Sequence, residues 1–594
     1  RALNSAELIA FDVETTGLNK ISDTVVGICL AVESPHAYYI PIAHILNEAQ
    51  AEQGQMSLFA AEPELAPDQL PLATVLDAIR PAMSNPAIGK VAHNAKFDYV
   101  ILQRAGLTVT PITFDTMLAE WLTDPTSKHL GLKDLARHRL GIEMQPISDL
   151  IGTGKKARPF SEVDIDAAAP YGAADADMTL RLVEPLQAEL AQKNIEHLLE
   201  LELQVMPVLA AMEQAGVAID VPFFENFSAE LEQRTAALRS EIHEIAGHEF
   251  NINSTQQLSN ILFTELNLPH ERLKKTRSGH YSTASSVLQN LRMVDDFGII
   301  DKIIEYREVG KLRSTYVEAL PQQVNPTTGR IHTNFRQTGA VTGRLASNNP
   351  NLQNIPIRTE LGRKIRRGFV ARAGWQFVSA DYSQVELRIL AHVSGDETLL
   401  KAFHDGEDIH RLTASQVNGI VLEEVTFEQR RQAKAVNFGL MYGMGPYRLA
   451  NDNDMTLAEA ENYIKAYFER FPGVRAYLDN TKKRAAEDGY VETLIGRRRY
   501  FPIFQQGSRA NQRFIAQAER VAVNHPIQGT AADIIKVAMI RLHKALLANY
   551  RARILLQVHD ELIIEAPDDE VEAVKALLIE TMSNAFKLDV PLKV

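Results

Sequence analysis

Residues 430–443 have the sequence RRQAKAVNFGLMYG, the most informative segment of the chain. Four side chains recur in it every four residues: Arg430, Lys434, Phe438 and Tyr442. On a helix this spacing places two cations and then two rings on one stripe. Two cations suit a triphosphate, and two rings suit a base and a sugar. A helix with a solvated basic end and a buried aromatic end is the alternative, but it gives cations and rings no reason to share a stripe.

Two aspartates lie on either side of this segment, each at the end of a run that we expect to form a strand. Asp381 follows residues 377–380 (FVSA), and Asp560 comes shortly after residues 554–558 (ILLQV). Two strands that each deliver an aspartate could share a pair of metal ions. Phosphoryl transfer needs such a pair because its transition state spreads negative charge over oxygens. Either aspartate alone would more often be an ordinary surface residue.

A second set of acids opens the chain. Asp12 and Glu14 stand two residues apart at the end of the apolar run 8–11, so on a strand both carboxylates point to the same face. Two like charges repel each other there, and a divalent cation bound by oxygen ligands is the usual remedy. For this pair alone, two solvent-facing acids on an edge strand would be the more frequent arrangement.

Two later clusters favour the metal site. Asp98 lies near a predicted strand-to-helix junction, and Tyr171 and Asp175 stand four residues apart on one face of a predicted helix. Four acids and a tyrosine in this order resemble the 3′→5′ exonucleases of the DEDD type, in which the tyrosine positions water. The resemblance spans about residues 8–183 and implies an RNase H-like fold whose four acids hold two metal ions. Because all four acids are present, an active site is favoured over a scaffold.

Taken together, the motifs resemble those of the family A DNA polymerases, in the arrangement of a Klenow-type large fragment. The resemblance covers nearly the whole chain and implies an α/β multidomain protein. An RNase H-like 3′→5′ exonuclease domain at 1–196 would precede a right-hand polymerase domain at 197–594. The implied subdomains are a thumb at about 221–325, a palm at about 326–393 and 525–594, and fingers at about 394–524.

The resemblance also implies site residues. Asp381 and Asp560 would bind a metal pair, Glu561 would be an auxiliary acid near the primer end, and Tyr171 would serve the exonuclease. The residues expected at the incoming nucleotide are Arg430, Lys434, Phe438, Tyr442, His410, Glu386 and Gln384. The residues expected to contact DNA are Arg344, Gln528, Asn524, Arg520, His559, Lys274 and Lys275. The exonuclease metal ligands would be Asp12, Glu14, Asp98 and Asp175.

Residues 342–345 and 524–530 match segments that contact the minor groove near the primer terminus. Purine N3 and pyrimidine O2 occupy similar places in every Watson–Crick pair, so donors from Arg344 and Gln528 could check pair geometry without reading sequence. A phosphate contact is the alternative for Arg344. A plain surface loop is the alternative for Lys274 and Lys275.

The resemblance implies two Mg²⁺ ions in each active site, with Mn²⁺ as a substitute and Zn²⁺ as a further option in the exonuclease site. The implied partners are primer-template DNA and dNTPs, and the chain is expected to be a monomer. Two other functions share some of these features. A single-subunit RNA polymerase shares the two aspartates and the basic-aromatic helix, but Glu386 and the exonuclease acids argue against it. Intact metal ligands argue against a DNA-binding scaffold without activity.

Composition agrees with a multidomain globular protein. The chain has 594 residues, of which 45% are hydrophobic and 23% charged, and these values exclude a disordered or fibrous chain. Its one cysteine, Cys29, permits no internal disulfide and fits a reducing compartment. No apolar run approaches the roughly 18 residues of a membrane span, and the N-terminus lacks the order of a signal peptide. We therefore expect a cytoplasmic protein without a membrane partner.

The net charge of −13 would argue against a nucleic-acid partner if it were evenly spread. The charge is unevenly spread, because residues 475–520 hold ten basic side chains against five acids, and residues 358–372 hold six basic side chains against one acid. We also expect strands at 8–11, 25–30 and 38–40, and an inserted surface loop at 47–71. One long helix is expected over 183–214 and mostly helices over 221–320.

Overall fold

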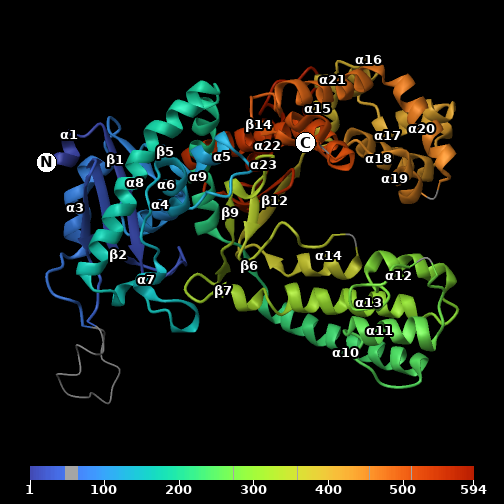
Figure 1. Cartoon of the computed structure of the whole chain (residues 1–594), viewed down its shortest axis with the longest axis horizontal. Helices are drawn as coiled ribbons and strands as arrows, with labels where there is room; N and C mark the ends of the chain where they lie inside the picture. Colours follow the sequence, from blue (N-terminus) through green and yellow to red (C-terminus); the bar gives the residue numbers. More distant parts are fainter. Residues whose placement is uncertain (47–63, 272, 358, 454, 510) are drawn as a thin grey trace. The chain divides into compact units, whose positions relative to one another are not determined.

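The computed structural model describes residues 1–46, 64–271, 273–357, 359–453, 455–509 and 511–594. Contacts between Cα atoms divide the chain into two compact units (Figure 1). The first unit comprises residues 1–215, 335–346 and 378–594, and the second comprises 216–334 and 347–377. Among the described residues, no helix is long and apolar enough to span a membrane.

A five-stranded sheet organises the N-terminal part of the first unit. Its spatial order is β3 (His36–Pro41), β2 (Val25–Glu33), β1 (Leu8–Thr15), β4 (Gly89–Ala92) and β5 (Ile112–Asp115). The first three strands are antiparallel, whereas β4 and β5 run parallel to β1. This order is that of an RNase H-like domain and confirms the three predicted strands. The helices around the sheet are α1 (Ala2–Ser5), α3 (Leu72–Met83), α4 (Ala95–Arg104), α5 (Thr116–Thr123), α6 (Leu132–Leu140), α7 (Ser148–Ile151), α8 (Ile165–Gln192) and α9 (Glu196–Ala215).

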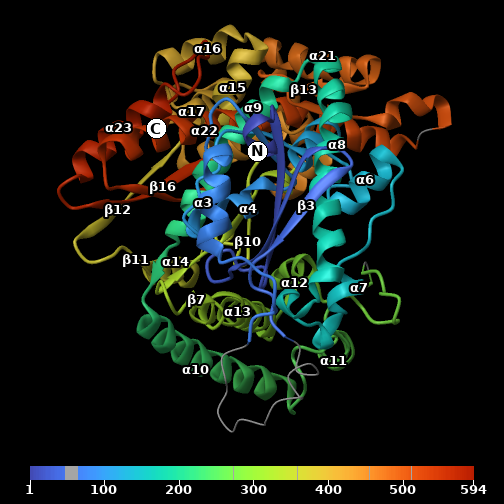
Figure 2. The same cartoon turned by 90° about the vertical axis from the view of Figure 1, so that its left-hand side faces the viewer.

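Alternation along β1 divides its side chains between two cores. Ile9, Phe11 and Val13 are buried with residues of α3 and α4 on one face of the sheet. Ala10 is buried with residues of α5, α8 and α9 on the other face. Figure 2 shows α3 and α8 on opposite sides of the sheet. Since Asp12 and the residues at even positions of β1 share the direction of Ala10, the acids of this strand face α8.

The single helix predicted over 183–214 is wrong, because the chain forms two helices there. The first, α8, ends at Gln192, and the second, α9, begins at Glu196. Asn194 between them has a φ of 54°, a left-handed conformation that a helix cannot continue through. The predicted end of the second helix is correct, since Gly216 follows α9 with a φ of 58°.

A three-stranded sheet forms the centre of the C-terminal part of the first unit. Its order is β12 (Trp375–Asp381), β16 (Glu561–Pro567) and β15 (Arg553–Val558), and β15 and β16 form an antiparallel hairpin. The strand ends predicted at Asp381 and before Asp560 are therefore confirmed. The helices of this part are α15 (Val385–Ser394), α16 (Glu397–His404), α17 (Ile409–Asn418), α18 (Phe427–Met441), α19 (Pro446–Asp452), α20 (Leu457–Arg470), α21 (Pro472–Asp488), α22 (Gln512–Asn549) and α23 (Val571–Ser583), with a hairpin of β13 (Tyr490–Glu492) and β14 (Arg498–Tyr500).

The second unit is mainly helical, as the sequence predicts for residues 221–320. Its helices are α10 (Val221–Ala246), α11 (Thr255–Asn260), α12 (Ser285–Leu291), α13 (Ile299–Leu312) and α14 (Glu360–Arg367). Its short strands are β6 (Ala218–Ile219), β7 (Val324–Asn325), β8 (Arg330–Ile331) and β11 (Phe369–Val370). In the sequence, β9 (Asn334–Arg336) and β10 (Ala346–Asn348) each include residues assigned to both units. The helices α10 and α13 pack together, and Arg234 donates two hydrogen bonds to Glu305, at 2.6 and 2.7 Å. This unit also includes residues 347–377, so the thumb, palm and fingers boundaries stay predictions.

Most of the loop predicted at 47–71 lies outside the described residues, which resume at residue 64. The described end of this segment is hydrogen-bonded to His44, which lies shortly before the undescribed stretch 47–63. The Gln69 side chain accepts a hydrogen bond from His44 N at 2.7 Å and donates one to His44 O at 2.8 Å. Leu65 and Ile45 also form an antiparallel bridge.

Candidate active sites

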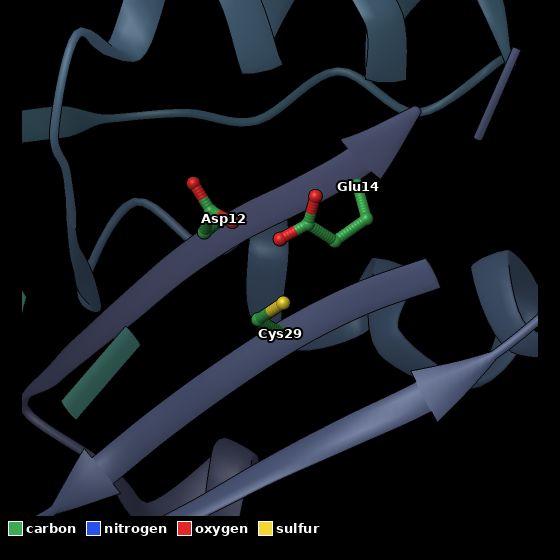
Figure 3. A group of neighbouring side chains, drawn as sticks. All are labelled: Asp12, Glu14 and Cys29. Carbon is green, nitrogen blue, oxygen red and sulfur yellow. The ribbon is translucent and has the colours of Figure 1, made fainter. Parts of the chain in front are cut away.

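The first candidate site lies on the α8 face of the five-stranded sheet. Asp12 on β1 is the direct partner of Cys29 on the antiparallel strand β2, so the two side chains share a face. Glu14 lies two residues further along β1 on the same face. Ligand atoms of these three residues all lie within 4.8 Å of one another, and Figure 3 shows them gathered between the two strands.

Asp98 and Asp175 come to this site from two helices. Asp98, in the first turn of α4, is 3% exposed and accepts a hydrogen bond from Val13 N at 3.1 Å, which fixes it to β1. Asp175 on α8 accepts hydrogen bonds from Lys133 Nζ at 2.9 and 3.2 Å. Lys133 Nζ also lies 4.2 Å from the centre of the Tyr171 ring. The structure thus brings together the four predicted acids and the predicted tyrosine.

The electrostatics of this site favour bound cations. Burial and the nearby charge of Asp175 raise the pKa of Asp12 to about 7. Burial and neighbouring acids also raise the pKa values of Glu14 and Asp98 well above the ordinary range. Among the described residues, Lys133 is the cation whose charge lowers the pKa values of Asp12 and Glu14 and so opposes these shifts. Since one cation faces four acids, the donor set fits divalent metal ions, which would offset the remaining charge.

Sequence reasoning missed two residues of this site, Lys133 and Cys29. The alternation of β2 could have located Cys29, because Ile28 and Leu30 on either side of it are buried in the opposite core. Only the strand register places Cys29 opposite Asp12, however, and the register was not predicted. Lys133 lies at the start of α6, far from any motif, and no sequence pattern indicates it.

The second candidate site lies where β12 and the β15–β16 hairpin end. Asp381 is the last residue of β12, and Asp560 lies in the hairpin turn. Tyr382 N donates a hydrogen bond to Asp560 O at 3.1 Å, so the two aspartate segments are joined through the backbone. Burial raises the pKa of Asp560 to about 6, and Glu386 and Asp381 add to this shift while Arg344 opposes it. Glu561 begins β16 and is half-buried.

The basic-aromatic segment forms the predicted helix, α18. It begins with a capping box in which Thr426 and Gln429 each accept a hydrogen bond from the other's backbone N–H. Arg430 Nε donates to Asp408 Oδ2 at 2.6 Å, while Lys434 is exposed and Phe438 half-buried. Tyr442 is the C-terminal cap residue of this helix. The four side chains therefore follow one another over four turns, as the spacing predicts.

His410 lies behind this stripe, in the first turn of α17. It is 1% exposed, its Nδ1 is 3.0 Å from Asn437 Nδ2, and its ring centre is 5.9 Å from that of Phe438. Burial lowers the pKa of His410 to about 4, so the ring is neutral at neutral pH. A direct role in charge neutralisation is therefore not available to it at that pH, although it can still donate one hydrogen bond.

Glu386 lies just beyond the turn that follows β12, in the first turn of α15. Gln384, with a φ of 56°, completes that turn. The Glu386 carboxylate accepts hydrogen bonds from the Tyr442 hydroxyl and, at 2.7 Å, from Arg344 Nη2. Gln528 on α22 is also hydrogen-bonded with Tyr442. Four residues predicted from separate motifs therefore form one connected group.

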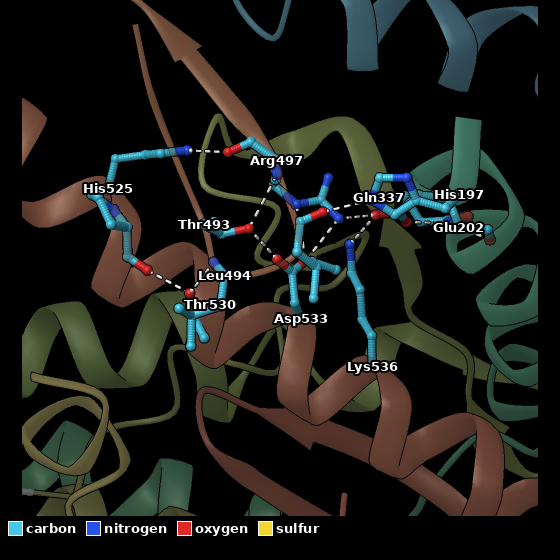
Figure 4. Close-up of polar contacts among 12 residues, drawn as sticks. His197, Glu202, Gln337, Thr493, Leu494, Arg497, His525, Thr530, Asp533 and Lys536 are labelled. Atoms are coloured by element: carbon cyan, nitrogen blue, oxygen red, sulfur yellow. Dashed lines mark hydrogen bonds and ion pairs between the residues drawn. The ribbon is translucent and has the colours of Figure 1, made fainter. Parts of the chain in front are cut away.

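A cluster of buried charged side chains, shown in Figure 4, lies against Gly343 and Gly529, the neighbours of Arg344 and Gln528 in the sequence. Arg497 Nη2 donates to Glu202 Oε1 at 2.7 Å and lies 2.8 Å from Asp533 Oδ1, and Lys536 also donates to Glu202. Thr493 Oγ1 donates to Asp533 Oδ2 at 2.9 Å. These side chains come from α9, α22 and the loop between β13 and β14, so the cluster joins three elements that are distant in sequence.

The other residues predicted to contact DNA do not belong to the connected group of Glu386, Tyr442, Arg344 and Gln528. Asn524 lies one helical turn before Gln528 on α22 and is half-buried. Arg520 and His559 are exposed, and the Arg520 side chain lies beside Gly443 after α18. Lys274 and Lys275 belong to the second unit, where both are exposed. Their roles toward DNA stay predictions.

Comparison with known proteins identifies the class that this fold and these sites define. Residues 221–594 match the model of DNA polymerase family A, and residues 1–191 match a 3′-5′ exonuclease domain model. The chain therefore belongs to DNA polymerase family A, with an N-terminal 3′-5′ exonuclease domain before the polymerase domain. The family resemblance inferred from the sequence motifs and the predicted fold class are confirmed.

Among similar proteins are two named DNA polymerase I. The one from Chloroflexus aurantiacus is 46% identical over 100% of this chain and 61% of its own length. The one from Pseudomonas aeruginosa is 43% identical over 100% of this chain and 63% of its own length. The chain thus spans about three fifths of these relatives. A solved structure, the POL domain of Pol1 from M. smegmatis in complex with DNA primer-template and dNTP, has a TM-score of 0.85 and 35% identity, covering 99% of this chain and 94% of that one.

Proposed function

We propose that this chain extends a DNA primer from its 3′-OH with dNTPs on a template and removes mismatched 3′ nucleotides with its N-terminal domain. The observation that carries the polymerase part is the joining of Asp381 and Asp560 by the hydrogen bond from Tyr382 N to Asp560 O, at 3.1 Å. It sets two carboxylates at one end of a sheet, as phosphoryl transfer requires.

Each residue of the polymerase site then has a task. Asp381 and Asp560 would hold two Mg²⁺ ions, which supply charge stabilisation to the attacking and leaving oxygens when bound. Arg430 and Lys434 bind the triphosphate, and Asp408 orients Arg430 through its 2.6 Å hydrogen bond. Lys434 is exposed and free to swing toward a ligand.

Other predicted residues complete this site. His410 donates a hydrogen bond to the triphosphate as a neutral ring. Phe438 and Tyr442 pack against the new base pair, Gln384 lies in the turn after Asp381, and Glu561 stays an auxiliary acid near the primer end. Mn²⁺ is the proposed substitute for Mg²⁺.

The exonuclease part rests on the gathering of four acids around β1. Asp12, Glu14, Asp98 and Asp175 would hold divalent cations, which supply a nucleophile from water when bound. Burial and the adjacent charge of Asp175 raise the pKa of the Tyr171 hydroxyl, so it keeps its proton. It therefore orients water by hydrogen bonding and does not act as a base.

The proposed macromolecular partner is primer-template DNA, and the chain acts as a monomer in the cytoplasm, where that DNA is found. Arg344 and Gln528 contact the minor groove near the primer terminus, and Asn524, Arg520 and His559 support contacts along the same strand. Lys274 and Lys275 contact duplex phosphates. Binding should weaken steeply with salt despite the net charge of −13, because basic side chains displace counterions from phosphates.

A single-subunit RNA polymerase is the alternative that the sequence left open, and the family membership of the chain does not favour it. One labelled primer-template tests the proposal when it is incubated with Mg²⁺, with dNTPs, with rNTPs and without nucleotides. Extension with dNTPs and 3′ degradation without nucleotides are expected, and preferential use of rNTPs would contradict the proposal.

Two variants assign the activities to their sites. Asp560→Asn should abolish extension and spare 3′ degradation, because it replaces a charged metal ligand by a neutral amide. Asp98→Ala should abolish 3′ degradation and spare extension, because the Asp98 carboxylate belongs to the acid cluster of the N-terminal domain. Loss of both activities in either variant would contradict two separate sites, provided that thermal unfolding shows the variant to be folded.

A further inference from the structure

Lys133 lies in the exonuclease centre, but the proposed function gives it no task. Its Nζ donates hydrogen bonds to both carboxylate oxygens of Asp175, at 2.9 and 3.2 Å. The same atom lies 4.2 Å from the centre of the Tyr171 ring, and the Tyr171 side chain is itself hydrogen-bonded with Asp175. One ammonium group therefore contacts both residues that α8 brings to the centre.

The packing of α6 brings Lys133 to this place. Lys133 lies in the first turn of α6, between Leu132 and Leu135, which pack into the core that α6 shares with α8. Figure 2 shows α6 beside α8. Arg137, one turn further along α6, is exposed and pairs with Asp134 at 2.7 Å. The contact with the acid cluster therefore belongs to Lys133 and is not a general property of the basic side chains on α6.

The charge of Lys133 acts on most of the acid cluster. It lowers the pKa values of Asp12, Glu14 and Asp175, against the effect of burial. Both oxygens of Asp175 face the ammonium group, so a divalent cation bound by Asp175 has to displace Lys133 from at least one of them. The two positive charges also repel each other. Lys133 and a bound cation therefore compete for the same carboxylate.

A displaced Lys133 has room to move and a charge to place. Its side chain is 28% exposed, and a lysine carries three donors on a flexible four-carbon stem. Four carboxylates match the charge of two divalent cations, which leaves the single charge of Lys133 without a counterpart in the centre. A phosphodiester carries one negative charge. The charge of the complete centre is therefore balanced when Lys133 faces the phosphodiester of a bound DNA strand.

We propose that Lys133 is a catalytic residue of the exonuclease centre and binds a non-bridging oxygen of the phosphodiester that is cleaved. Without metal ions it is held on Asp175. When the acids are occupied, it turns to the DNA strand and stabilises the charge that develops on the phosphoryl oxygens. Lys133 donates hydrogen bonds and keeps its proton, so none of its covalent bonds forms or breaks. The inference rests on the proposed exonuclease function, which supplies the phosphodiester.

The activity test uses Lys133→Met in the whole chain, which removes the charge and keeps an unbranched stem. At saturating Mg²⁺, kcat for 3′ degradation of a labelled strand should fall by about 100-fold, the effect of losing one donor to a developing anion. Lys133→Arg keeps the charge and should lose less than about tenfold. Arg137→Met is the matched control, because it removes an exposed cation from the same helix and should keep both activities. Extension by all samples should be unchanged.

A second measurement needs no activity. The melting temperature is followed as Mg²⁺ is added to the metal-free unchanged chain and to metal-free Lys133→Met. The half-maximal rise should need at least about threefold less Mg²⁺ in Lys133→Met, because the competing charge is gone. A lysine that only supported the fold would give the opposite sign, since its loss would loosen the acids. The centre at Asp381 and Asp560 is the same in both proteins and contributes equally.

The outcomes separate this proposal from the function on which it draws. Full recovery of kcat by Lys133→Met at saturating Mg²⁺ would overturn the contact with the phosphodiester. An equal or higher Mg²⁺ requirement in Lys133→Met would overturn the competition for Asp175. If Lys133→Met binds Mg²⁺ more tightly but the unchanged chain has no 3′ degradation, the competition stands, and the proposed exonuclease function fails together with the phosphodiester contact. If Lys133→Met does not fold, Lys133→Gln takes its place with the same expectations.

Discussion

Gly343 lies directly against the guanidinium group of Arg497: a Cβ at Gly343 would come within 2.6 Å of Arg497 Nε. Gly343 precedes Arg344, which the sequence predicts to reach the DNA minor groove. Gly529, next to Gln528, is equally close to Thr493, which hydrogen-bonds within the same cluster. The buried ion cluster therefore supports both segments that are predicted to contact the minor groove, and the two glycines let them approach it.

This contact predicts a large effect for Gly343→Ala. The added methyl group would collide with a buried side chain, and a φ of 83° strains any residue other than glycine. We expect a loss of roughly 2–4 kcal/mol in the free energy of unfolding, measured by chemical denaturation. Gly406→Ala is the matched control, because its φ of 73° is similar but nothing lies within 4 Å of its Cβ position. Equal losses in the two variants would show that the collision with Arg497 is unimportant.

The ion cluster itself predicts the effect of Glu202→Ala. Glu202 is fully buried and accepts from Arg497, Lys536 and Gln337. Its removal leaves two buried cations with one acid, Asp533, so we expect a loss of about 3–5 kcal/mol in the free energy of unfolding. Asp134→Ala is the control, since its pair with Arg137 is exposed and should contribute less than about 1 kcal/mol. A loss as small as that of the control would mean that the cluster relaxes or admits water.

The sequence indicated the separate parts of both sites but not how they connect. Asp381, Asp560 and the stripe on α18 were found because strand ends and four-residue spacing are local patterns. The contact of Glu386 with Arg344 joins two segments that are distant in sequence, and local patterns carry no information on such a pair. The cluster of Glu202, Arg497 and Lys536 was missed for the same reason, since Glu202 is 295 residues from Arg497 and 334 residues from Lys536 in sequence, and none of the three lies in a motif.

The raised pKa of Asp12 predicts how metal binding and pH together affect the free energy of unfolding. Burial raises the pKa of Asp12 from 3.8 to about 7. Between these values the folded, metal-free chain binds a proton that the unfolded chain has lost, so the free energy of unfolding falls as pH rises toward 7. A cation that binds the ionised site reverses this loss. We therefore expect Mg²⁺ to raise the melting temperature more at about pH 8 than at about pH 6.

Asp12→Asn provides the control for this linkage. The amide does not titrate, so the metal-free variant should lose less stability than the unchanged chain between about pH 5 and pH 8. Differential scanning calorimetry of both proteins in chelator, and then in Mg²⁺, gives the four curves required. An identical Mg²⁺ shift at both pH values in the unchanged chain would argue against protons and metal competing for Asp12.

Glu386 predicts how the chain selects the sugar of an incoming nucleotide. Its carboxylate is held by the Tyr442 hydroxyl and by Arg344 Nη2 at 2.7 Å, so both oxygens are already engaged. A ribose 2′-hydroxyl that arrived beside this pair would crowd a carboxylate whose two oxygens each already accept a hydrogen bond, and it would also crowd the Tyr442 ring. Deoxyribose avoids that cost, which we expect to be several kcal/mol.

Glu386→Ala should therefore raise rNTP use relative to dNTP use by roughly 100-fold if about 3 kcal/mol of discrimination is lost. The same change frees Arg344, so extension from a mismatched primer end should change as well. Tyr442→Phe keeps the ring and the carboxylate but removes their hydrogen bond, and it should retain most of the sugar selectivity. The measurement is the ratio of kcat/KM for dCTP and CTP on one template. If Glu386→Ala kept the ratio of the unchanged chain, the Glu386 carboxylate would not discriminate between the sugars, and a loss in Tyr442→Phe alone would assign the discrimination to the Tyr442 hydroxyl.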